Sequence, residues 1–291
     1  MRFESKDLIF GRPEQAVLGV EYYMCIDDDK LRRRMMGGVQ AIRDEVRVNG
    51  SDDGVDEECL EYVLDQEAGS SDTTFGNSQF PRDCDENGVR DDRKNPDGTG
   101  MRLADFLNHP SAKKSKLKAA HVAALRLYTT VAFRTINNGL RDQERFQAGR
   151  PHPLPVTVAF IKEALSKLRA VAGSSSDANT EVFLYRGMAG MRVQEDFLQQ
   201  GTGGTELAPM STTSSLKVAM QYSAAQNALL LRLRTSNFMV RGPNISFLSA
   251  FPAEEEFLFP PLTYLAPTGQ TQTLRVDDAT FTVIDVHPTM N

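Results

Sequence analysis

The chain has 291 residues, 40% of them hydrophobic and 25% charged, which is enough for one large globular domain or for one domain with an appended region. Its formal net charge is −6, from 33 basic and 39 acidic residues. This balance argues against nucleic-acid binding, because neutralising a phosphate backbone requires a broadly basic surface. It leaves room for a local basic pocket.

No apolar run approaches the roughly 20 residues that span a bilayer, and residues 1–15 lack the apolar stretch of a secretory signal. We therefore expect a soluble protein, cytoplasmic by default, with secretion by a route without a signal peptide left open. Cys25, Cys59 and Cys84 are too few for a disulfide framework and lack the spacing and histidine partners of a zinc site. They predict free thiols and no metal. The sequence does not indicate an oligomeric state.

The first hundred residues combine helical pieces with a long polar loop. Residues 14–48 carry apolar residues at helical spacing, 49–56 indicate a turn, and 57–67 predict a short helix. Residues 69–100 are dense in Gly, Ser, Asn, Asp and Pro, which predicts a solvated loop. The twelve-residue calcium-loop pattern fails on this stretch, because acids are missing at both of its ends.

Helices followed by strands are predicted from about residue 103 onward. Helical periodicity is found in residues 113–127, 131–140 and 156–170. A linker follows at 174–177, and one more helix is expected at 215–227. Strand character is found in residues 181–186, 229–234, 245–251, 255–259 and 280–286. This order favours an α+β domain over alternating βαβ units, and no GxGxxG or Walker sequence supports a Rossmann or P-loop nucleotide site.

The strand-like run at 181–186 ends in a first candidate for chemistry. Alternation places Val182, Leu184 and Arg186 on one face. An arginine at the end of an apolar strand needs an anionic partner, and its planar fork suits a pyrophosphate. Gly187 would let a ligand approach the backbone closely. Taken alone, this pattern is better explained by an arginine that extends into water.

A second candidate is a pair of hydroxyls that follows the glycine-rich stretch 201–204. Alternation in an extended segment places Ser211 and Thr213 on one face. Short hydroxyls there could orient a nearby carboxylate through hydrogen bonds. An ordinary β surface explains the same residues, so the motif is weak by itself.

A third candidate is the carboxylate pair Glu254 and Glu256. Two residues apart, they are expected to project from one face of an extended segment, with Phe257 and Phe259 turned toward a core. Adjacent like charges indicate either a solvated edge or a shared task. Cleavage of an N-glycoside passes through an oxocarbenium-like state that one carboxylate can stabilise while a second orients the nucleophile.

In this order, the segments 184–187, 210–214 and 254–260 resemble the Arg–Ser–Glu signature of the mono-ADP-ribosyltransferases. That family includes clostridial binary actin toxins and vertebrate arginine-specific ectoenzymes. A fourth segment, YTTVAFRTINNGLR at 128–141, resembles the family's helix that lines the NAD cleft. Two departures are visible: Phe133 stands where a second tyrosine is common, and Ser-Thr-Thr replaces Ser-Thr-Ser.

The resemblance covers residues 103–291 and implies an ADP-ribosyltransferase-like α+β fold, with N-terminal helices followed by a mostly antiparallel two-sheet β core and an NAD cleft. It divides the chain into a catalytic domain, 103–291, and an N-terminal extension, 1–102, of undetermined role. NAD is implied as a substrate, without a metal. The implied NAD-binding residues are Tyr128, Phe133, Asn137, Arg141, Arg186, Gly187, Ser211, Thr213 and Tyr222. The implied catalytic residues are Arg186, Ser211, Glu254 and Glu256.

The resemblance also assigns a role to each catalytic residue. Arg186 anchors the NAD phosphates, with Arg232 or Arg234 either assisting it or serving the fold alone. Ser211 holds Glu256, which accepts a hydrogen bond from the ribose 2′-hydroxyl and stabilises the cation as nicotinamide leaves. An aromatic residue at the position of Tyr222 stacks on nicotinamide in some relatives.

Glu254 bears on the acceptor, because family members with Glu-x-Glu generally modify arginine. A guanidinium is protonated and a poor nucleophile, so a nearby carboxylate can hold it in line and help remove its proton. The implied partner is a protein that carries an acceptor arginine, with no nucleic acid and no membrane segment. Two alternatives stay open: an NAD glycohydrolase that uses water, and an inactive NAD-binding or interaction module.

Overall fold

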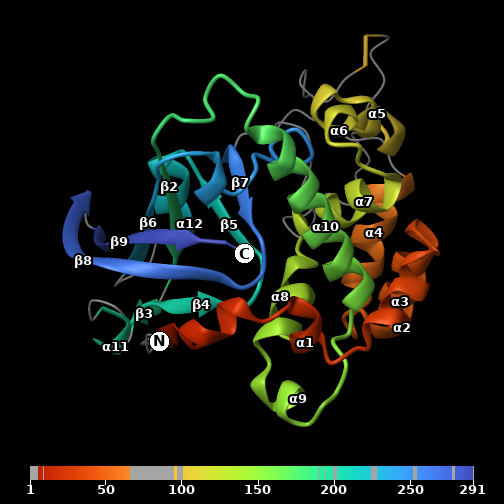
Figure 1. Ribbon diagram of the computed structural model, residues 1–291, viewed down its shortest axis with the longest axis horizontal. Helices are drawn as coiled ribbons and strands as arrows, with labels where there is room; N and C mark the ends of the chain where they lie inside the picture. Colours follow the sequence, from red (N-terminus) through yellow and green to blue (C-terminus); the bar gives the residue numbers. More distant parts are fainter. Residues whose placement is uncertain are drawn as a thin grey trace. The chain divides into compact units, whose positions relative to one another are not determined.

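The structure is a computed structural model whose described parts form two compact units, which are labelled by element in Figure 1. The sheet unit is drawn from residues 1–19, 172–245 and 254–291, and the helical unit from residues 20–171 and 246–253. The residues that the structure describes are 6–8, 10–65, 95–96, 101–189, 191–193, 195–198, 202–223, 228–251, 254–276 and 279–290.

The helical unit is packed around one buried helix, α7. Its helices are α1 (Val20–Met24), α2 (Asp28–Met35), α3 (Val39–Asn49), α4 (Val55–Asp65), α5 (Leu103–Asn108), α6 (Pro110–Lys114), α7 (Ala119–Tyr128), α8 (Phe133–Arg141), α9 (Gln143–Gln147) and α10 (Pro155–Ala172). Every residue of α7 from Ala120 to Tyr128 is buried, because α3, α4, α5 and α8 all pack against it. Among the described helices, none combines the length and hydropathy needed to cross a membrane.

Most of the predicted helices are confirmed. Helical structure is present in the predicted segments 14–48, 57–67, 131–140 and 156–170. The predicted helix at 215–227 is α12 (Leu216–Tyr222), and residues 224–227 lie outside the described part of the chain. The polar loop predicted at 69–100 also lies outside it, apart from residues 95–96, as does Cys84.

One predicted helix, at 113–127, is wrong because it is two helices. Lys116 has φ 53°, in the left-handed region, and the Leu117 N–H donates to the Ala112 carbonyl at 2.9 Å to close α6. The apolar spacing continues across this break. For that reason periodicity alone could not reveal it.

The sheet unit contains a seven-stranded sheet in the order β4-β8-β9-β6-β2-β5-β7, together with a separate parallel pair, β1 and β3. Its strands are β1 (Lys6–Leu8), β2 (Val182–Met188), β3 (Met191–Val193), β4 (Gly204–Glu206), β5 (Met210–Thr213), β6 (Ala228–Thr235), β7 (Glu256–Phe259), β8 (Thr263–Val276) and β9 (Ala279–Thr289). Neighbours in the larger sheet are antiparallel except β6 and β9, which are parallel. The α+β class and the mostly antiparallel sheet are therefore confirmed.

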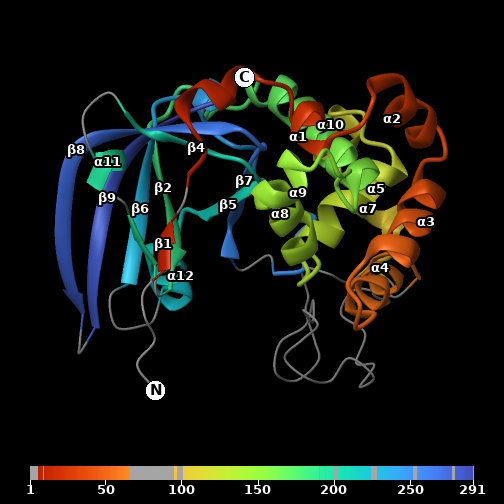
Figure 2. The same cartoon turned by 90° about the horizontal axis from the view of Figure 1, so that it is seen from below.

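The two-sheet core is corrected to one larger sheet, and strand β8 is the reason. Its first residues pair with β4 on one side and with β9 on the other. A register shift between Pro267 and Thr271 interrupts the β8–β9 ladder without ending it, and such an irregularity bends a strand. A single bent strand thus joins what would otherwise be two sheets. Figure 2 shows the long β8 and β9 side by side.

The strand predicted at 245–251 is wrong. Asn244 forms one isolated bridge to Phe257, and a turn follows at 246–248. The backbone of this segment instead finds partners on α7: Arg126 Nη1 donates to the Leu248 carbonyl at 2.9 Å, and the Ala250 N–H donates to Thr129 Oγ1 at 3.0 Å. The Ile245 N–H still donates to the Glu256 carbonyl of β7 at 2.9 Å, whereas the Leu248 carbonyl and the Ala250 N–H bond to side chains instead of to a strand.

Alternation along β2 and β6 gives the sheet two differently covered faces. One face carries Leu184, Leu231 and Leu233 within the larger apolar core. The opposite face is covered by α12, whose Ala219 is buried against it. At Gly187 an added Cβ would lie 1.9 Å from the Ala219 carbonyl oxygen, so the packing of α12 on β2 requires a glycine there.

Candidate active site

Strand β2 places Arg186 on the face of the large apolar core, in register with Leu231 of β6. Its side chain is only 18% exposed. Nη1 donates to the Ser211 carbonyl at 3.4 Å, and Nη2 lies 4.0 Å from Oε2 of Glu206. The structure therefore brings Arg186 next to the Ser-Thr-Thr strand, where it contacts the backbone of Ser211.

Glu206 was not predicted from the sequence. This residue of β4 has a side chain that is 5% exposed, and its Oε1 accepts from the Ala208 N–H at 3.1 Å. A buried carboxylate requires compensating donors or cations, and Arg186 is one of them. In the sequence, Glu206 could have been noticed as an isolated acid in the otherwise apolar tract that precedes Ser211.

The ladder between β5 and β7 arranges the hydroxyls and Glu256. Ser211 pairs with Leu258, and Thr213 pairs with Glu256. Cross-strand partners share a face of the sheet, so Ser211, Thr213 and Glu256 all lie on one face. Thr213 is the direct neighbour of Glu256 and Ser211 is its diagonal neighbour. The predicted common face of the two hydroxyls is confirmed.

The two carboxylates do not lie on one extended segment, which corrects the prediction made for them. Strand β7 begins only at Glu256, and Glu255 before it has φ 49°, in the left-handed region. Two side chains, from the last residue of β5 and from the residue after it, fix this turn. Thr213 Oγ1 donates to the Glu254 carbonyl at 2.5 Å, and the Ser214 hydroxyl donates to the Glu255 carboxylate.

Both carboxylates nevertheless act on the same phenol, that of Tyr222. The Tyr222 hydroxyl donates to Oε1 of Glu254. Desolvation of the hydroxyl, this hydrogen bond and the charges of Glu254 and Glu256 all raise the pKa of Tyr222. The residue as a whole is 56% exposed, so the desolvation is confined to its hydroxyl end. Burial raises the pKa of Glu254, and the hydrogen bond from Tyr222 opposes that shift.

The two acids differ in their surroundings. Glu256 is 5% exposed and belongs to the ladder of the sheet, whereas Glu254 is half-buried in the turn. Charges in a water-poor site interact more strongly than charges at a surface. The geometry thus gives one carboxylate fixed within a strand and a second one directed by a phenol.

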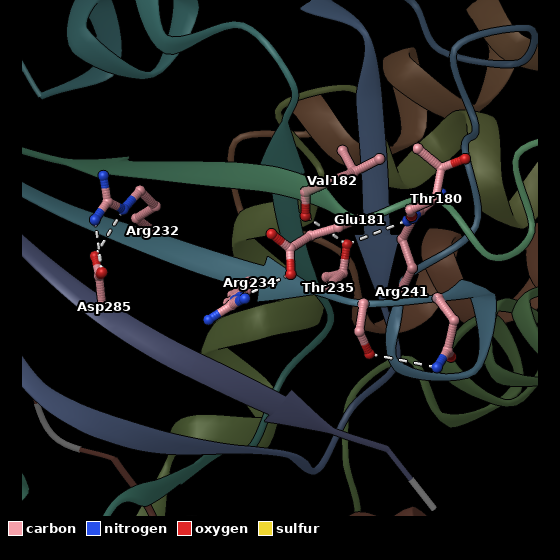
Figure 3. A network of polar contacts seen from close by, with 10 residues as sticks. Thr180, Glu181, Val182, Arg232, Arg234, Thr235, Arg241 and Asp285 are labelled. Carbon is pink, nitrogen blue, oxygen red and sulfur yellow. Dashed lines mark hydrogen bonds and ion pairs between the residues drawn. The ribbon is translucent and has the colours of Figure 1, made fainter.

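Arg232 and Arg234 lie on the face of the sheet opposite Arg186, because Arg232 pairs in register with Tyr185. Figure 3 shows Arg232 in a bidentate pair with Asp285, at 2.7 and 2.6 Å, and Arg234 beside Glu181, with Nε 2.7 Å from Oε2. The acidic partners of the two arginines, Asp285 and Glu181, lie on the same face of the sheet as the arginines themselves. Because Tyr185 also pairs with Thr213, this is the face that carries the side chains of Ser211, Thr213 and Glu256, and the two uses that the sequence left open for these arginines stay open.

The helix motif of 128–141 forms a compact cluster within the helical unit. Asn137 donates through Nδ2 to the Tyr128 hydroxyl at 3.3 Å, and the Tyr128 and Phe133 ring centroids lie 6.5 Å apart. Phe133, Asn137 and Arg141 are spaced by four residues, so they share one face of α8. Phe133 is 41% exposed, while the buried Asn137 Oδ1 has no hydrogen-bond partner among the described residues. A donor on a ligand would satisfy that atom.

Within the ranges that the structure describes, no group of three or more His, Cys, Asp or Glu side chains is arranged to hold a metal ion.

A sequence model described as NAD:arginine ADP-ribosyltransferase matches residues 102–281, which is more than half of the chain. The chain belongs to this family. The match confirms the resemblance seen in the four motifs, and with it an NAD-dependent ADP-ribosyltransferase whose substrates are NAD and a protein. A comparison with curated proteins gives no match.

Several solved structures are similar to this chain at low sequence identity. The ADP-ribosyltransferase HopU1 of Pseudomonas syringae pv. Tomato DC3000 has a TM-score of 0.47 and 21% identity, over 64% of this chain and 88% of its own. The type III effector XopAI of Xanthomonas axonopodis pv. citri has a TM-score of 0.46 and 16% identity, and the match covers 90% of this chain and 94% of the effector chain. The toxin Plx2a of Paenibacillus larvae has a TM-score of 0.45 and 18% identity, and the match covers 64% of this chain and 94% of the toxin chain. With TM-scores this low, family membership rests on the sequence match.

Proposed function

We propose that this chain breaks the nicotinamide–ribose bond of NAD and transfers ADP-ribose to an arginine of a protein. The observation that carries this proposal is the pair of unequal carboxylates at the start of β7. Glu256 is buried beside the hydroxyls of β5, and Glu254 is turned to the phenol of Tyr222. Two carboxylates in two environments suit two different tasks in one reaction.

The first task is to stabilise positive charge. As the bond between ribose C1′ and the nicotinamide nitrogen breaks, charge develops on the ribose. Glu256 accepts a hydrogen bond from the ribose 2′-hydroxyl and faces that charge in a water-poor place, where its effect is large. Ser211 lies on the same face and holds its carboxylate in place, while the Thr213 hydroxyl donates to the Glu254 carbonyl instead.

The second task is to bind the rest of NAD. Arg186 holds the pyrophosphate, because a guanidinium fork matches two phosphate oxygens. We further propose that Tyr128, Phe133, Asn137 and Arg141 contact NAD, along with Gly187 and the ring of Tyr222. The partnerless Oδ1 of Asn137 supports this assignment for α8. On this basis we place the catalytic domain at 103–291, with 1–102 as an extension.

The third task is to prepare the acceptor. Glu254 orients an arginine guanidinium so that one nitrogen attacks ribose C1′. The bond from C1′ to nicotinamide breaks, a bond from C1′ to the arginine nitrogen forms, and the guanidinium proton passes to the Glu254 carboxylate and then to water. Burial raises the pKa of Glu254, which makes it a better proton acceptor than an ordinary glutamate.

The test is incubation with labelled NAD and agmatine, an arginine analogue, while nicotinamide release and labelled adduct are both followed. The unmodified protein should form adduct, and Glu256→Gln should lose both products. Glu254→Gln should lose adduct while part of the nicotinamide release survives. Nicotinamide release without adduct from the unmodified protein would contradict arginine transfer and favour water as the acceptor.

A further inference from the structure

The hydroxyl of Tyr222 is held in a fixed place by the helix that carries it. α12 begins at Ser215, whose side chain accepts from the Val218 N–H at 3.4 Å, and ends at Tyr222. Its middle is locked on β2 by the contact between Gly187 and Ala219. The phenol therefore reaches Glu254 from a rigid support rather than from a loop.

Glu254 is fixed from two directions. Its backbone carbonyl accepts from Thr213 at 2.5 Å, and its carboxylate oxygen Oε1 accepts from Tyr222. A carboxylate whose one oxygen is occupied presents the other in a defined direction. The Tyr222 hydrogen bond also favours the ionised form of Glu254, against the effect of burial on its pKa.

We infer that the Tyr222 hydroxyl is a positioning group for the acceptor: it aims the second oxygen of Glu254 at the incoming guanidinium. This inference rests on the proposed function and adds a determinant of acceptor choice to it. A guanidinium requires an oriented, charged carboxylate, whereas water as a small neutral acceptor does not. The hydroxyl thus favours transfer to arginine over hydrolysis of NAD.

The role of the hydroxyl is separable from any role of the ring. Tyr222→Phe keeps an aromatic face for nicotinamide and removes only the donor to Glu254. Tyr264→Phe is the matched control, because its hydroxyl donates to the Thr202 carbonyl at 3.0 Å elsewhere in the sheet unit. Both substitutions remove one oxygen atom and one hydrogen bond.

The experiment measures agmatine adduct and nicotinamide release side by side for the unmodified protein and the two variants, as a function of pH. Tyr222→Phe should lower the ratio of adduct to hydrolysis by roughly tenfold, the size expected for a lost hydrogen bond to a charged group. The KM for agmatine should rise while the KM for NAD changes little. The acid limb of the transfer rate should move to higher pH, because Glu254 takes up a proton more readily without its donor.

The titratable groups described around Glu254 are Tyr222 from α12 and Glu255 and Glu256 from its own segment. Only the first is changed in the variant, so a shifted acid limb reports on that hydrogen bond. Tyr264→Phe should keep the ratio, both KM values and the acid limb.

The outcomes separate the two proposals. If the unmodified protein makes adduct and Tyr222→Phe keeps the same ratio and acid limb, the positioning role is wrong and arginine transfer stands. Equal losses of adduct and of hydrolysis in Tyr222→Phe would also overturn it, since the hydroxyl would then serve NAD cleavage itself. If the unmodified protein makes no adduct, arginine transfer fails, and the inference fails with it.

Discussion

Arg186 and Arg234 show that arginines on neighbouring strands can have opposite uses. Arg234 is paired with Glu181 on an exposed face, whereas Arg186 is largely buried beside Ser211 and Glu206. Exposed ion pairs contribute little to stability. The buried guanidinium next to the Ser-Thr-Thr strand is the one that we propose binds the pyrophosphate of NAD.

This difference predicts the outcome of replacing each arginine by lysine. Arg186→Lys should raise the KM for NAD by roughly tenfold or more, because an ammonium cannot make the bidentate contact of a guanidinium. Arg234→Lys should leave it unchanged, because Arg234 is exposed and paired with Glu181. Steady-state measurement of nicotinamide release checks both. Equal KM values in the two variants would contradict a phosphate-binding role for Arg186.

Arg145 is buried and donates to backbone carbonyls only in the hydrogen bonds described for it. Nε donates to Gly139 at 2.8 Å, Nη2 to Tyr23 at 2.6 Å, and Nη1 to Arg150. Arg145→Met would leave these carbonyls unsatisfied, so we expect the free energy of unfolding to fall by about 2–4 kcal/mol. Urea denaturation measures this. Arg33→Met, at an exposed position of α2, is the control and should change it by less than about 0.5 kcal/mol.

At the scale of secondary-structure elements, the loop between α9 and α10 is held in place by hydrogen bonds of one neutral histidine, His152. His152 Nδ1 accepts from the Leu154 N–H at 2.9 Å, so its Nε2, 3.0 Å from the Ile136 carbonyl, carries the proton. Gly139 leaves room for the ring, since an added Cβ would lie 2.3 Å from Nε2. A second proton on this imidazole would face the Leu154 N–H.

Burial lowers the pKa of His152 from 6.5 to about 4, which predicts a pH dependence of stability. Because the folded-state pKa lies below the unfolded value, the stabilisation is present above pH 6.5 and is lost as the pH falls toward 4. The loss should reach about 3 kcal/mol. His152→Gln should flatten this part of the profile, and His287→Gln, at an exposed position of β9, should keep it. Identical profiles for both variants would contradict a neutral buried His152.

The elements also show what a sequence can and cannot predict. Helix α10 and strand β6 were predicted because their apolar patterns are local. Strand β8 was missed because its Thr-Gly-Gln-Thr-Gln-Thr stretch has turn composition and is extended only through pairing with β9. The segment 245–251 has a strand-like pattern, yet its Leu248 carbonyl and Ala250 N–H bond to side chains of α7 and of its C-cap, Thr129.

In the candidate site, too, some features could be predicted from the sequence and others could not. Motifs that lie within one segment, such as Ser211 and Thr213, were predictable because strand alternation alone places their side chains. The pairing of Glu206 with Arg186 and the hydrogen bond from Tyr222 to Glu254 could not be predicted, because each joins residues of different elements. For Glu254 the predicted extended geometry is wrong, because the left-handed Glu255 interrupts it.

At the scale of the whole molecule, the residues proposed to bind NAD are found in both compact units. Asn137 lies in the helical unit and Arg186 in the sheet unit. If both contact NAD, then loss of either one should weaken binding of the same ligand. This consequence can be measured without catalysis, since a ligand that binds only the folded protein raises its stability.

We expect NAD at about one hundred times its Kd to stabilise the unmodified protein by about 2.7 kcal/mol, seen as a rise in Tm. Asn137→Ala and Arg186→Lys should each reduce that rise at the same NAD concentration. Asn138→Ala changes an exposed neighbour on α8 and is the matched control, which should keep the full rise. A normal rise in Asn137→Ala would show that the helical unit does not contribute to NAD binding through this residue, and would confine the proposed binding role to Arg186 and its neighbours in the sheet unit.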